Sequence, residues 1–112
     1  MNSIEKGKRG ERELAKKLRE RGFDKARRGQ QYHGLEGEDV VGLPLLHIEV
    51  TLKERVNIYD KIAQASNDAD ENKKPAVIHR KKHKGWLVTS KLDDYLDMYE
   101  AWLEKKEEKG SL

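Results

Sequence analysis

The chain contains no cysteine, only two prolines and one phenylalanine, and no long run of apolar residues. Without cysteine it can form neither disulfide bonds nor thiolate metal sites. No apolar segment approaches the roughly 18 residues of a membrane-spanning helix, and the first residues lack the apolar core of a signal peptide. We therefore expect a cytoplasmic protein that has no membrane partner.

Charged residues are abundant and unevenly distributed. They make up 40% of the 112 residues, against 35% that are hydrophobic. The net charge is +6 over residues 1–30, −4 over 31–74, +4 over 75–90 and −3 over 91–112, which gives +3 for the chain. Two basic segments flanking an acidic middle are expected of a protein that binds a phosphate backbone around a cation site. Two solvated faces on a lysine-rich protein would give the same pattern.

The length and the apolar periodicity predict one domain over residues 1–112. The expected fold class is α/β, with a small mixed sheet flanked by helices in the order αβββαββα. Helices are predicted at 4–21, at 57–70 and from 90 onward with fraying at about 105–112; strands are predicted at 23–28, 39–41, 45–53, 75–79 and 85–89.

Polar and aromatic residues add detail to the two later helices. Asn57 with Asp60, and Ser90 with Asp93, have the spacing of capping boxes. The aromatic residues expected in the core are Trp86, Tyr95 and Tyr99. Met98 and Trp102 lie off the main apolar stripe of the last helix and are candidates for a dimer interface.

The most informative segment is residues 45–53, where apolar and polar side chains alternate as in a strand with two different faces. Its polar face carries His47, Glu49, Thr51 and Lys53. A chain reversal around Pro44 would place Asp39 opposite Glu49, because both are equidistant from residue 44. Cross-strand partners have Cβ atoms roughly 5 Å apart, and two carboxylates that close repel unless a cation lies between them or one is protonated. The hairpin therefore predicts a metal site.

Glu11 is a third acid of interest, because it lies on the inward stripe of the first predicted helix, where a carboxylate needs a partner. A hard divalent cation such as Mg²⁺ prefers carboxylate oxygens, and two or three acids are its usual protein ligands. A bound cation lowers the pKa of its water and polarises a phosphoryl oxygen. This is the chemistry of phosphodiester hydrolysis.

Short segments of the chain follow one another in a recognisable order: Lys6–Leu14, Arg27–Gln31, Glu38–Gly42, Ile48–Thr51, Ala63–Ala65, His79–Arg80 and Trp86–Thr89. Together they resemble the PD-(D/E)XK nuclease superfamily, and more closely its Holliday-junction-resolvase branch of archaea and phages. The resemblance covers most of the chain. It implies a restriction-endonuclease-like core in a homodimeric enzyme that cuts four-way DNA junctions with Mg²⁺, or with Mn²⁺ in its place. It also implies a prokaryotic or phage-infected cell.

By this resemblance Glu11, Asp39 and Glu49 would hold the metal, and Gln64 would lie on a helix beside the site. The residues expected to contact DNA are mostly basic: Lys8, Arg9, Arg12, Arg27, Arg28, Gln30, Arg80, Lys81, Lys82 and Lys84. The loop Gly29–Glu38 would shape the access of branched DNA.

Two positions depart from the family pattern. Glu38 stands where a proline is usual, and Thr51 stands where a lysine is expected two residues after Glu49. Lys53 shares the strand face with Thr51, about 6–7 Å further along, and is a candidate replacement. Alternatively the site is impaired, which leaves a nuclease-fold module that binds DNA without cutting it. A third alternative is a protein-interaction domain whose basic segments are incidental.

Overall fold

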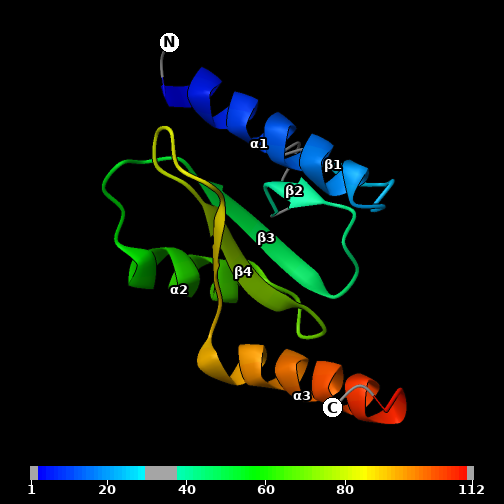
Figure 1. Ribbon diagram of the computed structural model, residues 1–112. Coiled ribbons are helices and arrows are strands. Elements are labelled where there is room, and N and C mark those ends of the chain that lie inside the picture. Colours follow the sequence, from blue (N-terminus) through cyan, green and yellow to red (C-terminus); the bar gives the residue numbers. More distant parts are fainter. Residues whose placement is uncertain (1–2, 30–37, 111–112) are drawn as a thin grey trace.

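The computed structural model describes residues 3–29 and 38–110, which form an α/β fold built on a mixed sheet (Figure 1). The elements are α1 (Ser3–Glu20), β1 (Arg27–Arg28), β2 (Val40–Val41), β3 (Leu46–Thr51), α2 (Ile58–Asp68), β4 (Lys74–His79), β5 (Leu87–Thr89) and α3 (Leu92–Glu108). The strand order in the sheet is β1-β2-β3-β4-β5. Strands β3 and β4 are parallel, and the other neighbouring pairs are antiparallel. The predicted α/β class with a small mixed sheet and flanking helices is confirmed.

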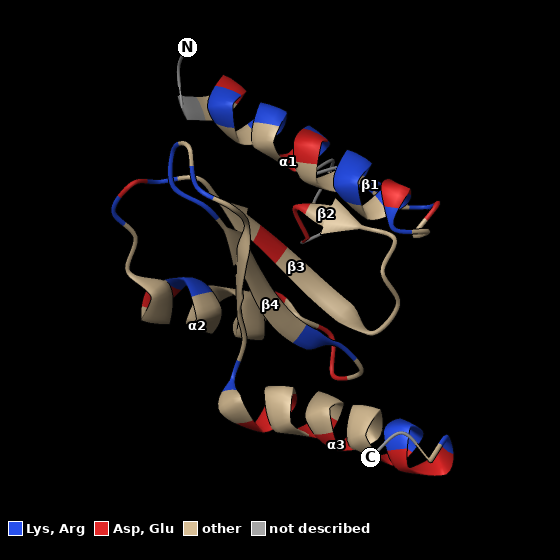
Figure 2. Cartoon of the chain, viewed as in Figure 1, with Lys and Arg blue, Asp and Glu red and all other residues tan. Residues whose placement is uncertain are grey.

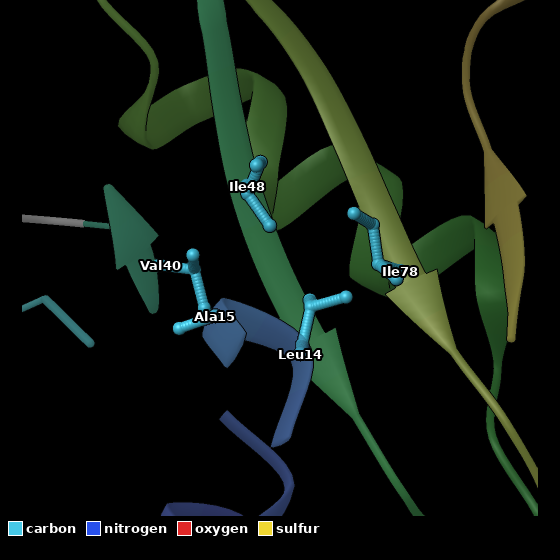
Figure 3. Close-up of a cluster of buried hydrophobic side chains, with 5 residues drawn as sticks. All are labelled: Leu14, Ala15, Val40, Ile48 and Ile78. Atoms are coloured by element: carbon cyan, nitrogen blue, oxygen red, sulfur yellow. The ribbon is translucent and has the colours of Figure 1, made fainter. Parts of the chain in front are cut away.

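The parallel pair β3–β4 determines how the layers are arranged. Parallel neighbours need a crossover connection, and α2 provides it. Helix α1 covers one face of the sheet, where Leu14 and Ala15 meet Val40, Ile48 and Ile78 in the core. Figure 3 shows these side chains between α1 and the strands, with α2 on the other side of the sheet. Strand β3, in the middle of the sheet, is therefore covered on both faces.

The predicted N-terminal cap is present in α2 and absent in α3. Asn57 caps α2 as predicted, because its side chain accepts a hydrogen bond from the Asp60 amide at 3.2 Å. The predicted capping box at Ser90 is wrong: α3 begins after Lys91 without a side-chain cap, and the Ser90 hydroxyl donates instead to the Lys91 carbonyl. Helix α3 extends through Glu108 and is thus longer than predicted.

Of the three aromatic residues predicted to lie in the core, only the one near the sheet does so. Trp86 packs against the core, whereas Tyr95 and Tyr99 on α3 are exposed, so their predicted place in the core is wrong. The physical reason is that α3 lies apart from the sheet rather than on one of its faces (Figure 1). Among the described residues, no helix combines the length and the apolar character needed to span a bilayer.

Helix α1 approaches β3 closely at a glycine. Gly10 is buried, and a Cβ atom added to it would overlap the side chain of Leu52, just after β3. Gly7, one turn earlier on the same helix, has open space around the equivalent position. The close approach brings Glu11, the next residue, to the sheet.

We predict that Gly10→Ala is less stable than Gly7→Ala by about 1–2 kcal/mol, because overpacking at Leu52 offsets the gain in helix propensity. Gly7→Ala, as the matched control, should be at least as stable as the wild type. Urea denaturation followed by circular dichroism measures both. Equal stability of the two variants would contradict the close approach, and Leu52→Ala should rescue Gly10→Ala if the overlap is its cause.

Candidate active site

The hairpin of β2 and β3 places two acids side by side, as the sequence predicts. Val40 pairs with Ile48, so Asp39 and Glu49 are the next opposed residues of the ladder. The Asp39 amide donates to the Ile48 carbonyl at 3.0 Å, and the Val50 amide donates to Asp39 Oδ2 at 2.8 Å. The predicted register is therefore confirmed, and a backbone amide holds the Asp39 carboxylate beside β3.

Glu49 is buried, with 7% of its surface exposed. Its pKa is raised from 4.5 to about 8, first because it is removed from water and second because Asp39 places a negative charge beside it. A hydrogen bond to Asp39 and the charge of Asp68 raise the pKa further, whereas the ammonium of Lys61 opposes the rise. At neutral pH the pair Asp39–Glu49 therefore carries one proton.

Glu11 approaches Asp39 from α1. Burial raises the pKa of Glu11, the hydrogen bond from Arg28 opposes this, and the charge of Asp39 adds to the rise. The Arg28 Nε donates to Glu11 Oε1 at 2.9 Å. The charge of Asp39 therefore acts on both of the other predicted acids, Glu11 and Glu49. Arg28 is the ion-pair partner of Glu11, and its predicted contact with DNA stays a prediction.

The acids fit a hard cation in kind and in charge. Within residues 3–29 and 38–110, no group of three acid or histidine side chains stands close enough together to hold a metal ion as it is. The two carboxyl groups of Asp39 and Glu49 nevertheless need a proton or a cation between them. The raised pKa of Glu49 is a consequence of this need. Glu11 supplies a third oxygen ligand if Arg28 releases it. Mg²⁺ accepts this ligand number because it keeps several waters.

A chain of polar contacts that leads from Glu49 to Lys73 was not foreseen from the sequence. His47 Nε2 lies 2.9 Å from Glu49 Oε1 and shares a hydrogen bond with it. His47 Nδ1 lies 3.9 Å from Glu38 Oε1, and Lys73 Nζ donates to Glu38 Oε2 at 2.8 Å. Strand alternation indicates that His47 and Glu49 share a face. The contact between Glu38 and Lys73 has no local signal, because it joins the end of one loop to another.

Helix α2 brings the cation Lys61 to the site, and its role there was not foreseen from the sequence. Lys61, Gln64 and Asp68 follow one another at helical spacing along one side of α2, and the charges of Lys61 and Asp68 both act on Glu49. Gln64, predicted beside the site, is exposed on that side of the helix. The position of Lys61 could have been found only by knowing which face of β3 the helix covers.

Thr51 and Lys53, the two further candidate catalytic residues, follow Glu49 in the chain. Thr51 is buried, and its hydroxyl accepts a hydrogen bond from the Lys53 amide at 3.4 Å. Lys53 follows the end of β3, and its side chain is exposed. The ammonium that acts on Glu49 is therefore that of Lys61 on the facing helix, and a role for Lys53 stays a prediction.

A basic cleft of about 650 Å³ lies between the first half of α1 and the turn that joins β4 to β5. It is lined by Lys6, Arg9, Gly10, Glu13, Leu52, Arg80, Lys81, Lys82, His83 and Lys84. Figure 2 shows the Lys and Arg residues along α1 and along this turn. Five of the predicted DNA contacts thus share one concave surface, namely Arg9, Arg80, Lys81, Lys82 and Lys84, and Lys6 and His83 join them.

The remaining predicted contacts lie elsewhere. Lys8, Arg12 and Arg27 are exposed but do not line the cleft. Gln30 and the central part of the predicted access loop fall outside the described residues. Glu11, Asp39 and Glu49 do not line the cleft, although two of its lining residues, Gly10 and Leu52, are the sequence neighbours of Glu11 and Thr51.

Contacts within the cleft hold one of its cations in place. The Arg80 guanidinium lies 4.3 Å from the centre of the Trp86 ring and also pairs with Glu13. Glu13 pairs with Arg9 as well, at 3.6 Å. The lysines of the turn 81–84 are exposed and keep their charges toward solvent. This arrangement can bind the phosphates of an extended polyanion.

Comparisons of the chain with protein-family models, with curated proteins and with solved structures find no match. The chemistry of the described residues is therefore the basis for inferring a function. It consists of an acid pair that shares a proton, a third acid held by an arginine, and a basic cleft.

The raised pKa of Glu49 predicts that stability falls as the pH rises. Between pH 4.5 and about 8 the folded protein binds this proton more tightly than the unfolded chain does. Its contribution is complete below pH 4.5 and is lost as the pH rises through 8. Glu49→Gln keeps a hydrogen-bond donor beside Asp39 and should remove this dependence, a change on the order of 2–4 kcal/mol.

The measurement is the free energy of unfolding from pH 5 to pH 9 for the wild type, for Glu49→Gln and for the exposed control Glu20→Gln. The control should follow the wild type. If the wild type and Glu49→Gln show the same pH dependence, Glu49 is not the group that holds the proton.

Proposed function

We propose that the protein is a Mg²⁺-dependent, structure-selective DNA endonuclease of the Holliday-junction-resolvase type. The observation that carries the proposal is the cross-strand pair Asp39–Glu49, whose shared proton marks a place for a cation. The same molecule carries a basic cleft. The resemblance to PD-(D/E)XK nucleases, drawn from the order of motifs, agrees with this placement of acids. The restriction-endonuclease-like core belongs to the same proposal.

Asp39, Glu49 and Glu11 would hold Mg²⁺, or Mn²⁺ in its place. When bound, the ion would supply the Lewis acidity and the charge neutralisation that phosphodiester hydrolysis requires. The protein's own groups prepare this state. The Val50 amide keeps the Asp39 carboxylate against β3, and His47 can take the proton that Glu49 must lose, because their atoms lie 2.9 Å apart.

Two cations of the chain have distinct roles in the proposal. Arg28 compensates the charge of Glu11 while the site is free, and it must release Glu11 for that oxygen to become a ligand. The ammonium of Lys61, on α2, favours the ionised form of Glu49. An ammonium near the reacting phosphate also stabilises the charge that develops there, so Lys61 can supply the group that Thr51 lacks.

The basic cleft would hold the DNA backbone. Its lysines and arginines form a concave row that passes Gly10 and Leu52, the neighbours of Glu11 and Thr51. The proposal requires that a backbone bound in this row extends to the acids, which do not line the cleft themselves. Phosphate contacts position nucleic acid without reading its sequence, which agrees with selectivity for DNA structure rather than for a sequence.

A specific observation favours a second function, a nuclease-fold module that binds DNA without cutting it. Each acid of the site already has a protein partner: Arg28 for Glu11, the Val50 amide for Asp39 and His47 for Glu49. Thr51 stands where a lysine is expected, and it is buried. If these contacts are not displaced, binding remains and hydrolysis does not occur.

Cleavage of a labelled four-way junction with Mg²⁺ or Mn²⁺ distinguishes the two functions. We expect the wild type to cut, and Asp39→Asn to lower the rate at least 100-fold while it still binds the junction. Thr51→Lys should increase the rate, since it restores an ammonium beside Glu49. The exposed control Asp70→Asn should cut like the wild type.

Each result has a distinct meaning. Cutting that survives Asp39→Asn would eliminate the proposed site. Binding without cutting, with activity gained in Thr51→Lys, would establish the non-cutting module. Weak binding that does not respond to salt would contradict both functions.

The cleft makes a separate prediction about affinity. Lys81→Ala combined with Lys82→Ala should weaken junction binding at every salt concentration and reduce the slope of log K against log salt by roughly two. The matched control is Lys16→Ala with Lys17→Ala, two exposed lysines of α1 that do not line the cleft. Fluorescence anisotropy between 50 and 300 mM salt, roughly the range in which such contacts weaken, measures both. An equal effect of the two pairs would mean that the cleft has no special part in binding.

A further inference from the structure

Helix α3 (Leu92–Glu108) carries an apolar stripe that the described part of the chain does not cover. The stripe consists of Leu92, Tyr95, Leu96, Tyr99 and Trp102, and these side chains are between 39% and 69% exposed. No residue of the helix is buried, and Figure 1 shows the helix set apart from the sheet. An apolar surface of this extent marks a contact site for another molecule.

The side of α3 that touches the rest of the molecule is the polar one. Lys74, at the start of β4, pairs with Asp94 at 3.2 Å and with Asp97 at 2.8 Å. At 3.6 residues per turn, these two acids lie roughly opposite the centre of the apolar stripe. A further hydrogen bond, from Lys91 Nζ to Ser66 Oγ at 2.5 Å, holds the beginning of the helix against α2. The chain's own contacts therefore keep the stripe turned outward.

A row of three acids runs along one border of the stripe. Asp93, Glu100 and Glu107 follow one another at intervals of seven residues, and Leu96 and Leu103 have the same spacing. A seven-residue interval returns to nearly the same side of a helix, so the acids form a line beside the two leucines. All three acids are exposed, and within the part of the chain that the structure describes none of them forms an ion pair. Their charges are therefore available to a molecule that covers the stripe.

Neither DNA nor this chain's own helices complement the surface. DNA is repelled, because α3 carries seven acids against two lysines. In an antiparallel pair of α3 helices the acid row would face the same row of the other copy, and in a parallel pair it would face the side of Tyr95 and Trp102. The first arrangement opposes like charges, and the second leaves the row without a partner. The basic helix α1 is not available either, because its Leu14 and Ala15 are buried in the core.

We propose that the stripe of α3 is the docking site for a basic amphipathic helix of another protein. Apolar side chains of that helix would cover Tyr99 and Trp102, and the lysines or arginines at its border would pair with Asp93, Glu100 and Glu107. An apolar surface that receives an amphipathic helix is a recurring mode of recognition, and charges beside the stripe set the choice and the orientation of the partner. Neither the acid site nor the basic cleft takes part, so the proposal is independent of the proposed nuclease function.

A synthetic peptide tests the docking site on the full chain, without DNA or metal. The probe is a Leu/Lys peptide of about 18 residues, roughly the length of α3 at 1.5 Å per residue, whose leucines form a helical stripe bordered by lysines. Isothermal titration calorimetry should show one peptide bound per chain in the micromolar range. A scrambled peptide of the same composition should bind at least about 10-fold more weakly, because it has the charge without the stripe. A Leu/Glu peptide with the same stripe should not bind.

The apolar contribution is tested at the end of the stripe. Trp102→Ala should weaken binding of the Leu/Lys peptide at least about 10-fold, because large aromatic residues carry most of the energy of such contacts. The control Tyr59→Ala changes an aromatic residue of α2 that is 81% exposed, and it should leave the affinity unchanged. Equal affinities for all three proteins, or a Leu/Lys peptide that binds no better than its scrambled form, would overturn the docking site. So would a wild type that sediments as a dimer and becomes a monomer in Trp102→Ala, because a second copy would then cover the stripe.

A charge exchange tests the acid row. Glu100→Lys combined with Glu107→Lys should weaken binding of the Leu/Lys peptide at least about 10-fold and create affinity for the Leu/Glu peptide. The matched control is Glu104→Lys with Glu108→Lys, the same change of charge on the side of the helix away from the stripe, and it should reduce the affinity far less. All four positions are exposed, so both variants should keep the circular dichroism spectrum of the wild type. Equal effects of the two pairs would overturn the choice of a basic partner helix.

Discussion

The candidate site depends on the contact between the Asp39 carboxylate and strand β3. Beyond Val40 the ladder between β2 and β3 ends, and the Val50 amide finds its acceptor in the side chain of Asp39. This bond keeps a negative charge in a fixed position, opposite Glu49 and within reach of Glu11. The raised pKa of both glutamates depends partly on this charge. A shift of the hairpin register by one residue would turn every side chain of β3 to the other face and separate the three acids.

Burial of the second face of β3 explains why the site contains so many charged residues. Because β3 and β4 are parallel, α2 crosses the sheet and covers the face that carries His47, Glu49 and Thr51. Buried polar groups must be paired there, and in the described part of the chain no buried side-chain nitrogen or oxygen lacks a hydrogen-bond partner. The chain of contacts from Glu49 through His47 and Glu38 is thus required for folding as well as available for chemistry. Burial and the acid pair together keep a proton on Glu49.

What the sequence predicted well was local. The hairpin register followed from symmetry about Pro44, the capping of α2 from the spacing of Asn57 and Asp60, and the inward stripe of α1 from helical periodicity. These patterns are set by neighbours along the chain. The elements themselves were found for the same reason, although several strands are shorter than their apolar segments suggested.

What the sequence did not predict was tertiary. The contact between Arg28 and Glu11 was not foreseen, because it arises from the packing of α1 beside β1. Lys61 gave no signal, because its role depends on which face of the sheet α2 covers. Tyr95 and Tyr99 were assigned to the core because an apolar stripe normally packs within its own chain, and α3 turns its polar side inward instead.

Under the proposed function, DNA binding and hydrolysis would make different demands on this protein. The cleft has six lysines and arginines against a single glutamate, and Trp86 and Glu13 already hold Arg80 in place. A phosphate backbone can be attracted to this surface without any rearrangement, over the roughly 10 Å that charges act through at moderate salt.

The acids, unlike the cleft, cannot bind their ligand without rearrangement. A cation would have to displace the shared proton from Glu49 and separate Glu11 from Arg28. Affinity for DNA should therefore be nearly independent of the acids, whereas hydrolysis is coupled to pH and to the strength of these internal contacts. Under the proposed function, the phosphates of bound DNA would offer Arg28 another anionic partner. DNA would then lower the cost of freeing Glu11, so that the metal site is completed only when the substrate is present.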